Sequence, residues 1–413
     1  MISIILLSLA CSLLLIALVA LCLIIYRINR DLCEKVFSSF RTVGLVKTVK
    51  KIIHYRQLRS LPTLIEDAND SDWIEYDDAI SVALRLTGGF GDYIISAKVI
   101  EELLSIAFCK LVIFAEKQEF ANAIYCNYPD TTLNFKDQFF QEASKYDLAL
   151  DIGHFVECFN YRKDKVKLIS GELAKRIDFL IENYSKIYVD IEQQWYRERI
   201  RFEKCRLDGL DRWTELRMGK TFDISDKKIK IPLLSEHRNC LEQLGLTNRQ
   251  YITINYGADA MRVGLKQLKL WPKDNLEKFI SLFHEKYPSI CIVQLGAKNA
   301  EKISGANLYV LGESIENTKW ILKQSSLHVD CEGGLVHLAT QLDTKCVVLF
   351  GPTPVHMYGY KQNINIHNDE CDYCMGLTRD WAYECFKGYC ECNCLRNISP
   401  ELVMSKIAEE QLF

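Results

Sequence analysis

Two glycine-rich loops, far apart in the chain, each join a strand-like run to an apolar, helix-like run. The first is Gly-Gly-Phe-Gly-Asp at 88–92, and the second is Glu-Gly-Gly at 332–334. A helix that begins in this way offers free backbone N–H groups and the positive end of its dipole to an anion. Glycine also lets a phosphate approach the backbone closely. The two loops therefore predict paired α/β units that share one anionic ligand, and a nucleotide sugar is a suitable candidate.

Strand-like and helix-like runs alternate on both sides of residue 245, which predicts the α/β class with parallel sheets. The expected strands are 79–86, 110–115, 147–152, 228–234, 251–255, 289–295, 327–330 and 346–350. The expected helices are 92–106, 118–125, several within 171–220, 273–286, 318–324, 334–342 and 400–411. Two successive units, each with a glycine loop after a strand, predict two facing Rossmann-like domains, 79–245 and 246–413, with a ligand-binding cleft between them.

The first 26 residues are almost wholly apolar and long enough to span a bilayer as a helix. No basic residue precedes this run, which favours an uncleaved transmembrane anchor over a signal peptide. Nine Lys and Arg residues against two acidic ones follow between Arg27 and Arg59. By the positive-inside rule we expect a single-pass protein of the inner membrane whose body faces the cytoplasm. Segment 27–78 is expected to be a basic amphipathic helix, lying on anionic lipid or serving as a solvated spacer, followed by an acidic linker.

The chain has 17 cysteines, and in a protein whose body is cytoplasmic they do not imply disulfides. Six of them fall within 371–394, where a Cys-x-x-Cys pair places two thiolates within reach of one metal and a second pair could complete a tetrahedral zinc site. The four candidate ligands of this structural zinc are Cys371, Cys374, Cys385 and Cys394. Reduced unliganded thiols, a disulfide and an iron–sulfur cluster are the alternatives. The net charge of −3 argues against nucleic acid as the main partner.

Several blocks of sequence, taken in order, resemble the bacterial heptosyltransferase family, also called glycosyltransferase family 9, which has the GT-B fold. The blocks stand at 84–92, 255–258, 269–272 (Lys-Leu-Trp-Pro), 332–339 (Glu-Gly-Gly-Leu-Val-His-Leu-Ala), 350–353 and 394–401. The chain departs from the family in Glu332, where Asp is usual, and in Gly333, where Ser or Thr is usual. The loop between Gly257 and Lys269 is also longer than expected for the family, and these departures leave the donor sugar open. The N-terminal anchor is atypical of the family as well.

The resemblance implies an inverting transfer in which an acceptor hydroxyl attacks a nucleotide-activated sugar. Such a reaction needs a general base and stabilisation of the departing diphosphate. Asp92 matches the family's proposed base, and Lys269 matches the lysine that contacts the diphosphate. The other residues that match the donor side are Glu332 for sugar hydroxyls, Gly333, Gly334 and His337 for the phosphates, Asn255 and Gly257 along the cleft, and Glu301 toward the nucleoside. The loop glycines Gly88, Gly89 and Gly91 match the first motif.

Each of these residues also has a purely structural interpretation. Asp92 could be an ordinary helix N-cap, and the two roles compete for the same oxygens, so a base should leave one oxygen facing the cleft. Lys269 could be a surface lysine, and His337 a satisfied core histidine. Trp271 is more consistent with core packing at the start of a helix. The glycines could serve only tight turns.

The sequence thus favours a membrane-anchored glycosyltransferase that moves a sugar, with a heptose as the suggested one, from an ADP-sugar to a lipid-linked saccharide in lipopolysaccharide or related glycan synthesis. No cofactor is expected for catalysis, because no Asp-x-Asp motif follows a predicted strand to hold a divalent metal against the diphosphate. One alternative is a dinucleotide-binding oxidoreductase, although the first loop lacks the Gly-x-Gly-x-x-Gly pattern. The other is a catalytically inactive scaffold of a glycan-assembly complex.

Overall fold

The computed structural model describes residues 74, 76–187, 197–257, 268–378, 380–389 and 392–413. The predicted anchor and basic segment, 1–73, therefore lie outside the described residues. Among the residues that are described, no helix is long and apolar enough to cross a membrane.

The first half of the described chain forms a five-stranded sheet with the strand order β3-β2-β1-β4-β5. Its strands are β1 (Ile80–Leu86), β2 (Cys109–Ala115), β3 (Thr131–Asn134), β4 (Leu148–Ile152) and β5 (Val156–Tyr161). Strands β1 to β4 pair in parallel, as predicted, and only β5 runs antiparallel, at the edge. The central strand β1 is buried along nearly its whole length, as its unbroken apolar sequence requires.

Helices connect the strands of this sheet in the expected alternation. They are α4 (Phe90–Ile106), α5 (Gln118–Tyr125), α6 (Phe139–Glu142), α7 (Lys163–Ile169) and α8 (Gly171–Ile187). The α4 helix places Ile94, Ile95, Val99 and Leu103 in the core beneath it. The predictions for 92–106 and 118–125 are confirmed.

The connection to the second sheet contains α10 (Arg197–Leu207), the short 3₁₀ helices η3 (Thr214–Arg217) and η4 (Ser235–His237), and α11 (Cys240–Gln243). The prediction of a strand at 228–234 is wrong. The backbone N–H of Ile229 donates to the side-chain Oε1 of Gln341, and the Lys228 ammonium donates to the Gln341 carbonyl. This segment is therefore held against a helix by side chains, and its alternating apolar residues reflect docking rather than strand pairing.

The second half forms a six-stranded, wholly parallel sheet with the order β11-β10-β9-β6-β7-β8. Its strands are β6 (Tyr251–Asn255), β7 (Cys291–Gly296), β8 (Leu308–Leu311), β9 (His328–Cys331), β10 (Cys346–Phe350) and β11 (Ile364–His367). Its helices are α12 (Lys273–Lys286), α13 (Ile315–Gln324), α14 (Gly334–Gln341), α15 (Val355–Tyr358), α16 (Asn393–Arg396) and α17 (Pro400–Glu409). The Ser399 side chain caps α17 as predicted, by accepting from the N–H of Leu402 at 3.1 Å.

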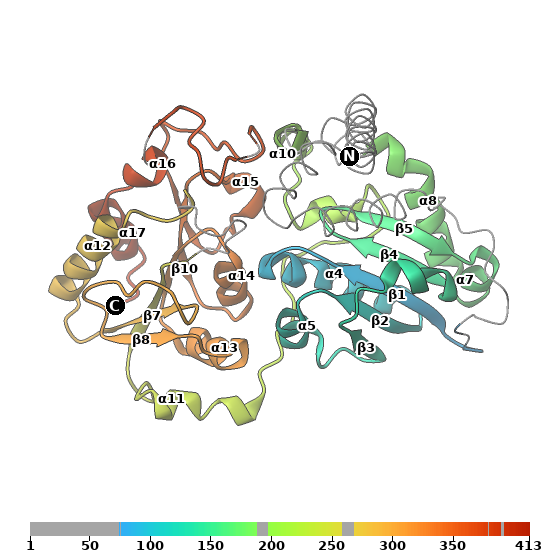
Figure 1. Ribbon diagram of the computed structural model, residues 1–413, viewed down its shortest axis with the longest axis horizontal. Coiled ribbons are helices and arrows are strands. Elements are labelled where there is room, and N and C mark those ends of the chain that lie inside the picture. Colours follow the sequence, from blue (N-terminus) through green and yellow to red (C-terminus); the bar gives the residue numbers. More distant parts are fainter. Residues whose placement is uncertain (1–73, 75, 188–196, 258–267, 379, 390–391) are drawn as a thin grey trace, which may run out of the picture. The chain divides into compact units, whose positions relative to one another are not determined.

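The helices that follow the two glycine loops, α4 and α14, lie side by side between the two sheets (Figure 1). A Cβ atom added to Gly334 would lie 3.0 Å from Cβ of Phe90. The first turns of the two helices are thus in direct contact, and the residues that the two motifs carry meet there. The boundary at residue 245 stays a prediction, with one sheet on each side of it.

Candidate active site at the two glycine loops

The first glycine loop is built around the Asp92 carboxylate. The backbone N–H of Gly89, the N-cap residue of α4, donates to Oδ2 of Asp92 at 2.9 Å. Asp92 therefore stands at the third helical position and closes the loop as one half of a capping box, rather than being the N-cap itself. Gly88 has a φ of +104°, and a Cβ there would clash with the same oxygen, so only glycine fits.

The second oxygen of Asp92 is bound to a residue that the sequence analysis did not select. Nη2 of Arg212 donates to Oδ1 of Asp92 at 2.9 Å and also to the carbonyl of Gly153. Burial would raise the pKa of Asp92, but the Arg212 guanidinium, with His154 and the Gly89 N–H, outweighs it and lowers the pKa to about 2. Asp92 is thus an anion at any working pH. Both of its oxygens already accept a hydrogen bond, so the free oxygen expected of a base is not present in this structure.

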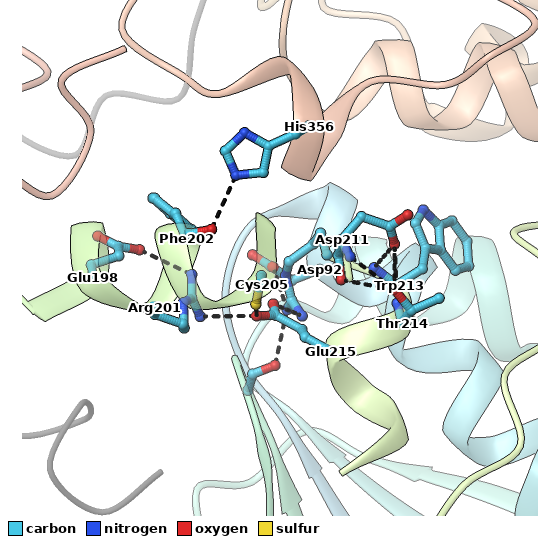
Figure 2. A network of polar contacts seen from close by, with 12 residues as sticks. Asp92, Glu198, Arg201, Phe202, Cys205, Asp211, Trp213, Thr214, Glu215 and His356 are labelled. Atoms are coloured by element: carbon cyan, nitrogen blue, oxygen red, sulfur yellow. Dashed lines mark hydrogen bonds and ion pairs between the residues drawn. The ribbon is translucent and has the colours of Figure 1, made fainter. Parts of the chain in front are cut away.

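Arg212 belongs to a chain of alternating buried charges, of which Figure 2 labels Asp92, Glu215, Arg201 and Glu198. Its Nη1 donates to Oε1 of Glu215 at 3.0 Å, and Oε2 of Glu215 lies 3.7 Å from Nη1 of Arg201. Arg201 in turn donates to Glu198 at 3.4 Å. The Arg201, Arg212 and Glu215 side chains are all at most 2% exposed. Buried charges persist only when paired, and this chain pairs each one from Asp92 out to α10.

The second glycine loop leads into α14, and the first turn of this helix packs against the first glycine loop. A Cβ on Gly91 would lie 2.6 Å from Cδ2 of His337, which stands one turn into α14. Gly333 is extended, with a φ of 176°, and a Cβ there would meet nothing closer than 3.7 Å. Gly91 and Gly334 therefore serve the contact between the helices. Sterics do not require glycine at position 333.

Lys269 and Glu332, predicted to bind separate parts of the donor, pair with each other in this structure. Nζ of Lys269 lies 2.9 Å from Oε2 of Glu332, whose other oxygen lies 3.9 Å from Nε2 of His337. Burial opposes both charges, but each favours the other, so the pKa of Glu332 is lowered and that of Lys269 is raised. The surface-lysine interpretation is wrong, because the Lys269 side chain is only 21% exposed and lies beside the motif.

His337 is held by the hydroxyl of Tyr360, which lies 23 residues later in the chain. Its Nδ1 lies 2.5 Å from Oη of Tyr360, which also accepts from Nε1 of Trp213 at 3.1 Å. Burial lowers the pKa of His337, although Glu332 and Asp92 oppose the shift. The imidazole is therefore neutral near pH 7, with one ring nitrogen as donor and the other as acceptor.

The remaining predicted donor residues lie at the carboxyl ends of the strands of the second sheet. The Asn255 side chain, at the end of β6, donates to the Gly257 carbonyl at 3.0 Å and to Asp330 at 3.1 Å. Glu301 follows β7, is 56% exposed and pairs with Nζ of Lys273 at 2.5 Å. It stands apart from the contact between the glycine loops. Trp271 is 2% exposed, as predicted for a core residue.

The predicted zinc ligands gather in the segment after β11. Burial raises the pKa of Cys374 to about 12, and the neighbouring thiols of Cys394, Cys385 and Cys371 contribute to the shift. Sγ of Cys392 lies 3.0 Å from Sγ of Cys394. Across the described ranges, no three Cys, His, Asp or Glu side chains are arranged so that they could hold a metal ion. We refer to Cys371, Cys374, Cys385, Cys392 and Cys394 as the cysteine cluster.

Comparison with known proteins identifies a family that the part of the chain carrying most of these residues resembles. Residues 194–380 match the family model described as glycosyltransferase family 9 (heptosyltransferase). The match spans 187 of the 413 residues, and over that region the chain is similar to family 9. The resemblance that the motifs predicted is therefore confirmed, and the family 9 match includes Lys269, Glu332 and His337 as well as Arg212 and Tyr360.

The individual relatives are distant. Lipopolysaccharide heptosyltransferase 1 of Campylobacter coli is 26% identical over 196 residues, which are 40% of this chain and 56% of that protein. The chain thus spans about half the length of the curated relative that it matches. The iron-containing dodecameric glycosyltransferase TibC from enterotoxigenic E. coli aligns over 82% of this chain and 80% of its own, with 13% identity and a TM-score of 0.50. TibC in complex with ADP-D-beta-D-heptose gives 14% identity, coverages of 82% and 77%, and the same TM-score. These structures establish a GT-B-like glycosyltransferase fold.

Sequence reasoning missed Arg212, Trp213 and Tyr360. The one available signal was local: Asp211 and Thr214 have the spacing of a side-chain-capped turn, and the Asp211 carboxylate does accept from the N–H of Trp213 at 3.0 Å and of Thr214 at 3.1 Å. That pattern does not predict which side chains of the turn face the site, or which residues they contact.

Proposed function

We propose that this protein is an inverting glycosyltransferase that moves a heptose from an ADP-heptose to a saccharide acceptor. One observation carries the proposal: the two glycine-loop helices meet, so that Asp92 of the first domain and Lys269, Glu332 and His337 of the second surround one small region. Two similar proteins support the choice of sugar. TibC forms a complex with ADP-D-beta-D-heptose, and the Campylobacter coli relative is a lipopolysaccharide heptosyltransferase.

The donor diphosphate would occupy the start of α14. Free backbone N–H groups and the helix dipole attract the phosphates there, and Lys269 adds a full positive charge. Lys269 is paired with Glu332 in this structure, so the diphosphate would compete with Glu332 for the ammonium. The freed carboxylate would then be available to accept hydrogen bonds from sugar hydroxyls.

Transfer would form a bond between the acceptor oxygen and the anomeric carbon while the bond from that carbon to the diphosphate oxygen breaks. The electron pair of the broken bond remains on the diphosphate, beside Lys269 and the α14 N-terminus. The acceptor proton would pass to Asp92, whose side chain is 26% exposed and so can be reached. A carboxylate with a pKa of about 2 is a weak base. It can take the proton only once the leaving group has largely departed and the acceptor hydroxyl has become acidic.

The test is a transfer assay of the detergent-solubilised full chain with ADP-, GDP- and UDP-sugars, together with thermal stability in the presence of each. We expect one ADP-sugar to stabilise the fold, by about 2.7 kcal/mol at one hundred times its Kd, and to be consumed. Lys269→Ala should lose the stabilisation. Lys273→Ala, which removes a more exposed lysine that pairs with Glu301, is the matched control. Stabilisation by NAD(P) alone would favour the oxidoreductase, and binding without turnover the scaffold.

We propose further that residues 1–26 anchor the enzyme in the inner membrane, with the body in the cytoplasm and a lipid-linked acceptor on the same surface. The apolar run and the basic residues after it support this arrangement. Carbonate extraction and protease accessibility of inverted vesicles test it. Release of the full chain by carbonate, or protection of the C-terminal body in inverted vesicles, would contradict it.

The cysteine cluster is proposed to hold one structural metal ion, with zinc as our expectation. The number of cysteines in this one segment supports the proposal, because a bound cation would hold as thiolates the sulfurs that burial otherwise keeps protonated. The thiols would have to move closer together than they lie here, where no three of the described side chains could hold an ion. TibC is described as iron-containing, so iron is the competing metal. Elemental analysis of the purified protein, with Cys371→Ser and Cys374→Ser as test variants and the exposed Cys126→Ser as control, decides between zinc, iron and no metal.

A further inference from the structure

A single turn of the first domain reaches both halves of the site. Residues 211–215, which we call the bridging turn, are tied by the Asp211 carboxylate to the backbone N–H groups of Trp213 and Thr214 (Figure 2). The backbone N–H of Arg212 donates to the Met357 carbonyl of the second domain at 3.0 Å. Hydrogen bonds therefore fix the backbone at Arg212 and Trp213. The side chains of these two neighbours extend toward different candidate catalytic residues.

Arg212 reaches the first of these candidates, Asp92, as described above. Trp213 reaches the second, through Tyr360. The Trp213 indole and the Tyr360 ring pack edge to face with centroids 6.3 Å apart, and Tyr360 packs against the His337 ring at 5.5 Å. Trp213 and Tyr360 are each 2% exposed, and His337 is 4% exposed, so water does not compete for these hydrogen bonds.

The direction of each hydrogen bond follows from the groups involved. The indole N–H of Trp213 can only donate, so the Tyr360 oxygen must accept from it. Burial raises the pKa of Tyr360 far above its ordinary value, despite the opposing hydrogen bonds from Trp213 and Gln341, so the hydroxyl keeps its proton. That proton is then directed to the nearest acceptor, Nδ1 of His337 at 2.5 Å. A neutral imidazole that accepts at Nδ1 carries its own proton on Nε2.

We propose that Trp213 and Tyr360 are positioning residues that hold His337 as the tautomer protonated at Nε2, with this N–H facing Glu332 and the donor phosphates. Nε2 lies 3.9 Å from Oε1 of Glu332 and on the side of the ring that contacts Gly91. The role rests on the proposed transfer function. His337 then supplies a neutral hydrogen-bond donor to an oxygen on which negative charge grows as the diphosphate departs. The opposite tautomer would present a lone pair to that oxygen and repel it.

The tautomer can be measured without any turnover, by nitrogen NMR of the full chain labelled on histidine. The His337 signals are identified by their loss in His337→Asn. We expect a pyridine-like Nδ1 and a pyrrole-like Nε2 in the unsubstituted protein, and a mixture of tautomers in Tyr360→Phe and in Trp213→Phe. A protonated Nδ1 in the unsubstituted protein, or unchanged signals in Tyr360→Phe, would overturn the proposal.

Kinetics supply the second measurement. Tyr360→Phe should lower kcat by about tenfold, the value of one directed hydrogen bond, with little change in the KM for donor. Tyr251→Phe is the matched control, because it removes a buried hydroxyl of the same domain that donates to the Ile321 carbonyl, at 2.7 Å, and not to His337. Equal kcat values for the two variants would refute the positioning role. An unsubstituted protein that shows the expected tautomer but transfers no sugar would refute the proposed function instead.

Discussion

Replacing Asp92 by Asn removes the charge of the carboxylate but keeps its shape and its acceptor for the Gly89 N–H. The capping interaction survives if the amide oxygen takes the place of Oδ2, but the amide NH2 then faces Nη2 of Arg212, so two donors stand opposed where the ion pair was. The fall of the Asp92 pKa from 3.8 to about 2 corresponds to about 2 kcal/mol of stability. Because the Asp92 side chain is 26% exposed, solvent screening reduces this contribution, and we expect the loss of the charge alone to lower the free energy of unfolding by about 1–2 kcal/mol.

The sign of the pH dependence follows from the lowered pKa. A carboxyl group with a lower pKa in the folded protein stabilises the fold above its unfolded pKa, near 4. That contribution disappears as the pH falls through the folded pKa, near 2. Denaturant titrations at pH 7 and pH 3 should therefore show a larger difference between the unsubstituted protein and Asp92→Asn at pH 7 than at pH 3.

Asp92→Asn also distinguishes a general-base role of Asp92 from a purely structural one. If Asp92 accepts the acceptor proton, Asp92→Asn should lower kcat by about 10²–10⁴-fold while the donor still stabilises the fold. Asp151→Asn is the control: it neutralises another carboxylate on the first sheet, paired with Arg85 at 2.9 Å and 18% exposed. Transfer at an undiminished rate in Asp92→Asn would refute the catalytic reasoning and leave Asp92 a capping residue.

Three further substitutions test local packing and capping, the first at the site and the other two away from it. Gly91→Ala should displace the His337 ring, destabilise the fold by about 1–3 kcal/mol and lower kcat, whereas Gly171→Ala, with nothing within 4 Å of the new Cβ, should do neither in the same transfer and melting assays. Gly351→Ala places a Cβ 2.7 Å from a leucine side chain of α16, and we expect a lower Tm with unchanged donor affinity by calorimetry. Ser399→Ala removes the cap of α17 and should cost about 1 kcal/mol in denaturant titration, again without a kinetic effect.

The local sequence pattern was enough to predict many of the helices and strands correctly. The helices at 118–125 and 273–286 have the predicted bounds, because their apolar spacing and their flanking residues agree. The strand predicted at 228–234 failed because a segment docked on a helix and a half-buried strand share one alternating pattern. Strand β5 was missed because it pairs antiparallel at an edge, where its alternating sequence is hard to distinguish from that of a loop.

The part of the site that the sequence motifs carry could be predicted from the sequence. The two glycine loops predicted an anion-binding region, and their helices do meet, but Lys269 and Glu332 were assigned separate roles where the fold pairs them. Arg212 binds Asp92, which lies 120 residues earlier in the chain, and Tyr360 binds His337, which lies 23 residues earlier. Contacts of that separation depend on the packing of whole domains, which short-range periodicity does not encode.

The bridging turn limits how freely the two halves of such an enzyme can be exchanged. A chimera joined at residue 245 would carry Asp92 and Arg212 together on one parental segment, but it would part Trp213 from Tyr360. Such a graft could keep its acceptor preference and its donor pocket and still lose the histidine tautomer that links them. On the proposed roles, a graft that exchanges the first half would work only if the second half supplies a tyrosine at position 360 to pair with Trp213.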